Sequence, residues 1–151
     1  METRQALRAL VITDRQQNRV YDWERINVAK HDTKLISIDL VPMIVEHVWK
    51  NEGLKFHPVV ELLPDNAKHL GDATRTMVRF KRETYTWIVL HELAHSMTSE
   101  CSGVSNYHGS IFMGVYIQLL SRYLNLPYSK LVDSALNFGL KVKLDANVVF
   151  V

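Results

Sequence analysis

Hydrophobic residues recur at helical spacing in three stretches of the chain. The most regular stretch is Ile111–Leu124, where apolar side chains at i, i+3, i+4, i+7 and i+8 form one stripe. The same spacing predicts helices at 15–29 and 41–53. We also expect a largely buried helix at 83–98 and a last helix at 129–137, before Gly139. Thr13 and Gln16 have the three-residue spacing of a capping box, which favours a helix start at the first of these stretches.

The pattern of apolar and polar residues changes between positions 56 and 81, where short apolar runs alternate with turn residues. Phe56–Leu62 and Thr74–Lys81 have the composition of strands, and the sequences Pro64-Asp65-Asn66 and Gly71-Asp72 are typical of turns. We expect two or three strands of a small mixed sheet. The last residues, 141–151, are expected to form a further strand or a loose tail, and the whole pattern predicts an α+β fold.

Composition narrows the class of protein without defining its function. The 151 residues contain no repeat or Ser/Gly linker, which predicts one domain spanning 1–151. No apolar run approaches the roughly 18 residues of a membrane helix, so we expect a cytoplasmic protein with no membrane partner. The 18 Lys and Arg residues barely exceed the 16 Asp and Glu residues, and this balance does not predict nucleic-acid binding. The single cysteine, Cys101, excludes an internal disulfide.

A candidate metal site lies inside the helix predicted at 83–98. His91-Glu92-Leu93-Ala94-His95 is an HExxH motif, and on a helix the two histidines lie one turn apart on the same face. Both imidazoles can therefore bind one metal ion at about 2.0–2.1 Å. Apolar residues surround the motif, and burying its polar groups unpaired would cost several kcal/mol. A bound ion removes that cost, because it takes the imidazole lone pairs and its bound water interacts with the Glu92 carboxylate.

Two histidines leave a mononuclear zinc site one protein ligand short. His108 is the favoured third ligand, because it extends the apolar stripe of the next helix into what we expect to be its first turn. Glu100, Asp133 and His69 remain alternatives. We expect structural or surface roles for the other histidines, which are His31, His47 and His57.

The same residues indicate hydrolytic chemistry. A zinc ion on neutral imidazoles lowers the pKa of a water molecule bound to it toward about 7, and Glu92 is expected to accept the proton as general base. Tyr107 and Tyr116 are possible hydrogen-bond donors to an oxyanion, although tyrosines at helical spacing more often belong to the core or its rim.

HELAH followed by His108-Gly109-Ser110-Ile111-Phe112 resembles the SprT-like zincin metallopeptidases. The chain also resembles a family of small metallohydrolases from actinobacteria and their phages, in an N-terminal stretch from Asp14 to Glu24 and in the sequence VLHELAH. The resemblance implies a minimal zincin-like domain with His91, His95 and His108 as zinc ligands. It also implies that the strand at 74–81 offers an edge to a peptide substrate.

Two other functions stay open at this point. Zinc could stabilise a binding or regulatory module that catalyses nothing, or the site could hydrolyse a substrate other than a peptide. A purely structural site would have no need of a base at Glu92, which favours the enzyme.

Overall fold

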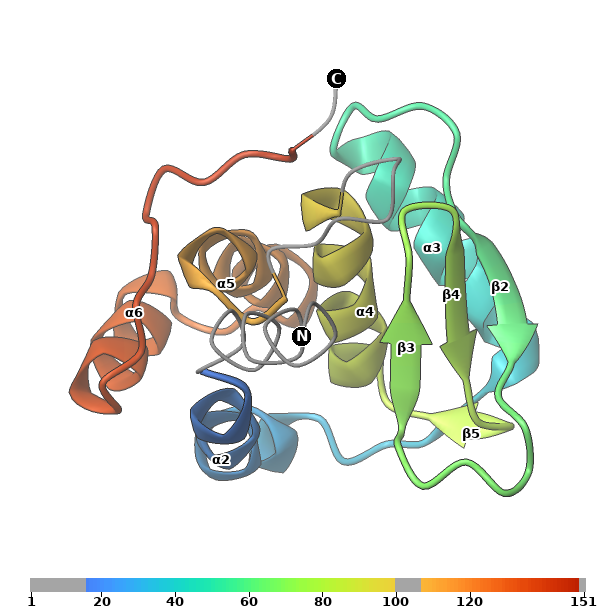
Figure 1. Cartoon of the computed structure of the whole chain (residues 1–151), viewed down its shortest axis with the longest axis horizontal. Helices are drawn as coiled ribbons and strands as arrows, with labels where there is room; N and C mark the ends of the chain where they lie inside the picture. The colour runs from blue at the N-terminus through green and yellow to red at the C-terminus, as the bar shows by residue number, and fades with distance from the viewer. Residues whose placement is uncertain (1–15, 100–106, 150–151) are drawn as a thin grey trace, which may run out of the picture.

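A computed structural model describes residues 16–99 and 107–149, and the predicted α+β class is confirmed (Figure 1). The helices are α2 (Gln17–Asn27), α3 (Val41–Asn51), α4 (Thr86–Thr98), α5 (Ser110–Leu124) and α6 (Tyr128–Asn137), with short 3-10 helices η1 (Ala29–His31) and η2 (Ile38–Leu40). The strands are β1 (Ile36–Ser37), β2 (Val59–Leu62), β3 (Gly71–Ala73), β4 (Met77–Phe80) and β5 (Glu83–Thr84). No helix of the described residues has both the length and the apolar character needed to cross a membrane.

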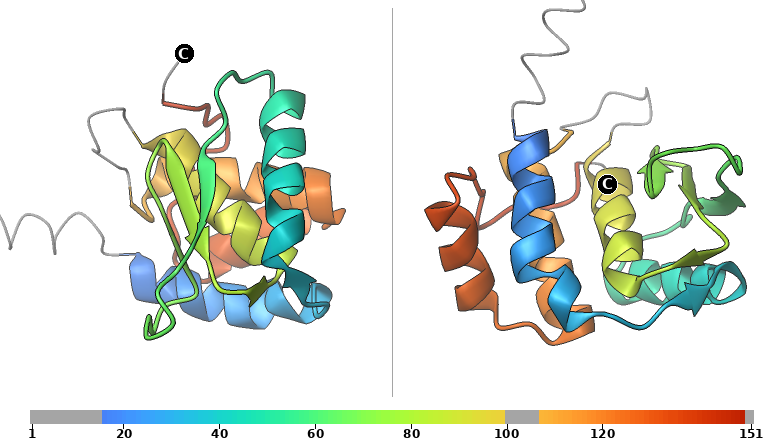
Figure 2. Two further views of the ribbon diagram at one scale, coloured as in Figure 1. Left: turned by 90° about the vertical axis from the view of Figure 1, so that its right-hand side faces the viewer. Right: turned by 90° about the horizontal axis from the view of Figure 1, so that it is seen from below.

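Helix α4 occupies the centre of the molecule. It lies between a three-stranded sheet on one side and α5 on the other, and the views in Figures 1 and 2 agree on this order. Helix α3 packs against α4 and β2, while α6 packs against α5 and α2. Because neighbours enclose α4, its side chains are buried on nearly every face, and those buried are Ile88, Val89, Leu90, His91, Glu92, Leu93, Ala94, Ser96, Met97 and Thr98.

Helix α4 begins three residues later than predicted. Glu83 and Thr84 form β5, which pairs antiparallel with β1, so they are extended rather than helical. The first turn of the helix is then capped from a distant segment, because the backbone N–H of Trp87 donates to the Asp32 carboxylate at 2.8 Å. This tertiary cap fixes where the HExxH helix starts.

The three-stranded sheet has the order β2-β4-β3, with β2 parallel and β3 antiparallel to β4. The predicted turn at Gly71-Asp72 is wrong, because these residues belong to β3 and pair with Phe80 and Arg79. The expectation that the strand at 74–81 is an edge for substrate is therefore also wrong. Both sides of β4 are already hydrogen-bonded, and β3 is the edge strand nearer to α4 in the part of the chain that the structure describes (Figure 1).

Helix α2 is shorter than the predicted helix at 15–29, and Thr13 of the proposed capping box lies outside the described residues. Gln16 has a tertiary role. Its Nε2 donates to the His108 carbonyl oxygen at 2.8 Å, and its Oε1 accepts the Lys141 N–H. Gln16 thus joins the start of α2 to two segments distant in sequence.

The segment after α6 contains no strand in its described part, 141–149, yet it is tied to the core. The Lys143 N–H donates to the Ser110 carbonyl oxygen at 2.9 Å, and the Val149 N–H donates to the Met97 carbonyl oxygen at 3.0 Å. The segment passes so close to α5 that a methyl group on Gly114 would collide with the Lys143 carbonyl oxygen. Only glycine allows this approach.

Replacing Gly114 by alanine tests this packing, because two effects of opposite sign compete. Helix propensity alone favours alanine by about 1 kcal/mol. The collision dominates, and we expect Gly114→Ala to lower the free energy of unfolding by about 1–3 kcal/mol in urea denaturation. Ser129→Ala, on the exposed start of α6, should change it by less than about 0.5 kcal/mol. A gain in stability for Gly114→Ala would show that the segment does not pack against α5 as described.

Candidate metal centre

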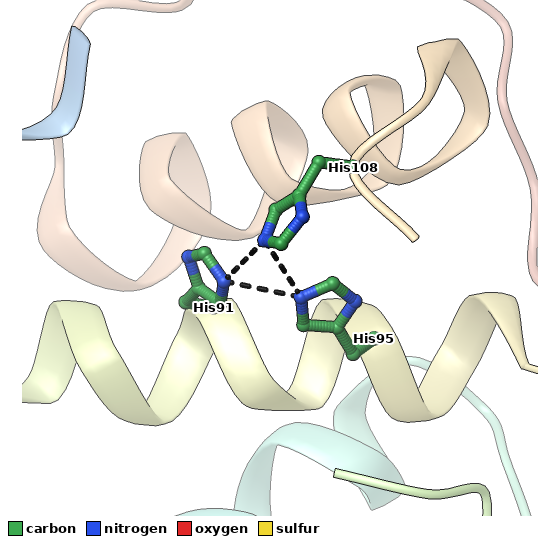
Figure 3. A group of neighbouring side chains, drawn as sticks. All are labelled: His91, His95 and His108. Atoms are coloured by element: carbon green, nitrogen blue, oxygen red, sulfur yellow. Dashed lines mark hydrogen bonds between the residues drawn. The ribbon is translucent and has the colours of Figure 1, made fainter. Parts of the chain in front are cut away.

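Three imidazole rings converge between α4 and the start of α5 (Figure 3). The Nε2 atoms of His91 and His95 are 3.1 Å apart, and the Nε2 of His108 lies 3.1 Å from that of His95 and 3.2 Å from that of His91. His91 and His108 are each only 5% exposed. These three residues could hold one metal ion.

The geometry fits a tetrahedral ion. Ligand nitrogens at about 2.0–2.1 Å from such an ion lie about 3.3–3.4 Å from one another, close to the distances observed here. All three rings present the same nitrogen, Nε2, so three lone pairs can point at one centre. Three imidazoles without thiolates suit zinc, copper, iron or nickel, and leave further coordination positions open to other ligands.

The three histidines are positioned in two different ways, two of them by a helix and the third by a side-chain hydrogen bond. His91 and His95 lie one turn apart on α4, as the motif predicts. His108 lies two residues before α5, not in its first turn as expected, because α5 begins at Ser110. Its backbone is held instead by the side chain of Gln16, which donates to the His108 carbonyl oxygen.

Phe112 forms the apolar base of the centre. Its ring is fully buried and stacks on His95 at 4.3 Å between centroids, and it contacts His91 and His108 at 5.1 Å each. Burial lowers the pKa of His95 well below its usual value of 6.5, and the charges of His91 and His108 act in the same direction. His95 is therefore neutral at pH 7, the form in which an imidazole binds a metal.

Glu24 bonds to His91 on the side of the ring that faces away from the other two histidines, a role that the sequence analysis missed. Its Oε2 accepts hydrogen bonds at 2.6 Å from His91 Nδ1 and at 2.6 Å from the Tyr116 hydroxyl. The first bond places the His91 proton on Nδ1, so that Nε2 is unprotonated and its lone pair can bind a metal. Burial and the nearby Glu24 charge raise the pKa of Tyr116 well above 10, so its hydroxyl stays protonated and donates.

Glu92 lies beside the three histidines rather than among the convergent nitrogens. Its Oε1 is 4.0 Å from His91 Nε2, and its Oε2 is buried without a hydrogen-bond partner in residues 16–99 and 107–149. Burial raises the pKa of this carboxyl group to about 7, against the effect of His91. A Cβ on Gly71 would lie 3.0 Å from Glu92 Cγ, so β3 packs closely against the Glu92 side chain.

Two of the three alternative third ligands, His69 and Asp133, do not join the cluster. His69 is exposed and bonds to Asp72 at 2.9 Å, and Asp133 is exposed on α6. Glu100 lies outside the described residues. The other three histidines are all exposed, as expected, and these are His31, His47 and His57.

The two tyrosines considered as oxyanion donors differ in their surroundings. Tyr116 is fully buried, and its hydroxyl already donates to Glu24, so it belongs to the core as the helical spacing indicated. Tyr107 directly precedes His108 and has a backbone φ of 51°, a conformation rarely adopted by bulky residues. The chain thus turns sharply just before the third histidine.

Comparison of this chain with protein-family models, curated proteins and solved structures found no match. The role of the centre is therefore argued from its own residues.

Glu24→Gln tests the support behind His91. The amide keeps the size of the side chain but removes the carboxylate that accepts the Nδ1 proton. We expect a 10- to 100-fold weaker zinc affinity, of the order found when such partners are lost, in a competition titration with a chromophoric chelator. Asp22→Asn changes an exposed acid on the same helix and should leave the affinity unchanged. Equal affinities for the Glu24→Gln variant and wild type would contradict the role given to Glu24.

Proposed function

We propose that this protein is a zinc-dependent metallohydrolase that cleaves peptide bonds, with Glu92 as general base. The observation that carries the proposal is the position of the Glu92 carboxylate. Its Oε2 is buried and unpartnered within the described residues, next to three convergent imidazoles. Leaving a buried polar atom unpaired costs about 1–3 kcal/mol, more if it is charged, so such an atom points to a reacting partner at this place.

His91, His95 and His108 would hold the ion through their Nε2 atoms. A bound zinc ion would supply Lewis acidity, polarising a carbonyl group and making water more acidic. Glu24 keeps His91 in the tautomer that this requires, with Nδ1 protonated. Phe112 closes the side of the centre that faces the core.

Glu92 moves the proton in the proposed reaction. Its carboxylate accepts a proton from the attacking water as the water oxygen bonds to the carbonyl carbon. It then gives this proton to the leaving nitrogen as the carbon–nitrogen bond breaks. Gly71 supports this role, because its missing side chain leaves room for the Glu92 side chain against β3.

The outer edge of β3 supports a peptide as the substrate. Among residues 16–99 and 107–149 this strand pairs only with β4, and it lies beside α4, which carries Glu92 (Figure 1). An extended peptide can add to such an edge through backbone hydrogen bonds. The substrate edge inferred from resemblance thus moves from β4 to β3.

Glu92→Gln separates the enzyme from a metal-stabilised binding module. Because Glu92 is not a ligand in this proposal, the variant should keep about one zinc ion per chain. It should lose hydrolysis of a denatured-protein library by about 10²–10⁴-fold, as measured by mass spectrometry of the products.

Glu61→Gln, on an exposed position of β2, is the matched control and should retain both zinc and turnover. Loss of zinc from Glu92→Gln would make Glu92 a ligand. A zinc-loaded wild type that cleaves no peptide would contradict the proposal, and would favour the binding module or a different class of substrate.

A further inference from the structure

A cavity of about 260 Å³ adjoins the candidate metal centre on the His91 side. We call it the side pocket, and its walls include Tyr21, Leu70, Gly71, Trp87, Ile88 and Glu92. These residues come from α2, from the first half of α4, and from the start of β3 with the residue before it, Leu70 (Figure 1). A ligand in the side pocket would therefore lie directly next to Glu92.

The walls of the side pocket leave large apolar side chains open to solvent. Leu70 is 52% exposed and Tyr21 is 46% exposed, and Trp87 and Ile88 lie on the facing helix. The Tyr21 ring also lies 5.3 Å from the ring of His108 and 6.3 Å from that of His91, which places it at the metal centre. Exposed apolar side chains gathered around a cavity are typical of a ligand site.

The polar groups of the side pocket are largely engaged with one another. Glu24 Oε2 accepts bonds from His91 and Tyr116, and His69 bonds to Asp72. Asp72 is in turn held by both Arg79 Nε and Nη2, at 2.7 and 2.6 Å. Glu92 is the exception, because its Oε2 has no hydrogen-bond partner within residues 16–99 and 107–149, and the proposed reaction uses this carboxylate at the metal centre. Elsewhere in the pocket a charged side chain would lose hydration and would meet partners that are already paired, whereas an apolar side chain would gain from leaving water.

The volume limits what the side pocket can hold. Pockets for whole small molecules span about 300–1,000 Å³, and a water molecule takes about 30 Å³. A cavity of about 260 Å³ therefore suits one large side chain. We infer that the side pocket binds one large apolar side chain of the substrate, next to the bond that is cleaved. This inference rests on the proposed function and names its substrate class: peptides with a leucine-like or phenylalanine-like residue at the cleavage site.

Hydroxamates with different side chains test the side pocket without requiring turnover. Acetohydroxamate, 4-methylpentanohydroxamate, 3-phenylpropanohydroxamate and 5-aminopentanohydroxamate share one zinc-binding group, and their affinities for the zinc-loaded protein can be measured by calorimetry. Burying one large apolar side chain predicts that the two apolar compounds bind about 10- to 100-fold more tightly than acetohydroxamate. The cationic compound should show no such gain.

Leu70→Ser should reduce the gain of the apolar compounds about threefold or more, because it replaces part of the apolar wall. Leu144→Ser is the matched control, since Leu144 is 54% exposed and does not line the side pocket, and it should keep the full gain. Equal affinities for all four compounds, or a preference for the cationic one, would overturn the inference while the proposed function could still hold. A protein that binds no zinc would overturn both.

Discussion

Three imidazole nitrogens lie within 3.2 Å of one another between two packed helices, and most of the structure serves to hold them there. Helix α4 brings two of the rings and is enclosed by the sheet and by α5. The third ring is positioned by the turn before α5, by Gln16 and by the aromatic base that Phe112 provides. The packing of α4 on α5 brings three nitrogen lone pairs together. These lone pairs would repel one another with no ion between them, and a bound metal ion would turn that repulsion into attraction.

The segments that build the centre are far apart in the sequence. Glu24 on α2 bonds to His91 on α4, and Tyr116 on α5 bonds to the same carboxylate oxygen. One buried carboxylate thus links three helices and also sets the tautomer of a candidate ligand. In a chain with a single cysteine, a metal and this hydrogen-bond network would replace the cross-links that disulfides provide elsewhere.

Local periodicity was enough to predict the parts of the site that lie within one helix. The spacing of His91 and His95 placed them on one face of α4. The apolar stripe of α5 favoured His108 as the third ligand, although this residue lies before the helix and not in its first turn. Contacts between segments distant in the sequence determined the sheet, which spacing did not predict correctly. Glycine at position 71 is typical of a turn, yet Gly71 lies in a strand, where it pairs with Phe80 and packs closely against Glu92. No spacing rule could show that β4 would pair on both sides.

Glu24 illustrates a signal that was present and overlooked. Val20, Trp23 and Glu24 have the i, i+3, i+4 spacing of one helix face, and all three are buried. An acid on an apolar face requires a buried partner, which is here the imidazole of His91. The partner itself could not be identified from the sequence, because 66 residues separate Glu24 from His91 along the chain.

The most direct test of this account is a crystal structure of the zinc-loaded protein with anomalous diffraction data collected on both sides of the zinc absorption edge. The account predicts one strong anomalous peak per chain, at about 2.0–2.1 Å from the Nε2 atoms of His91, His95 and His108. Glu92 should lie near the peak without binding to it. A peak bound by other residues, or by only two of these histidines together with Glu92, would contradict the account.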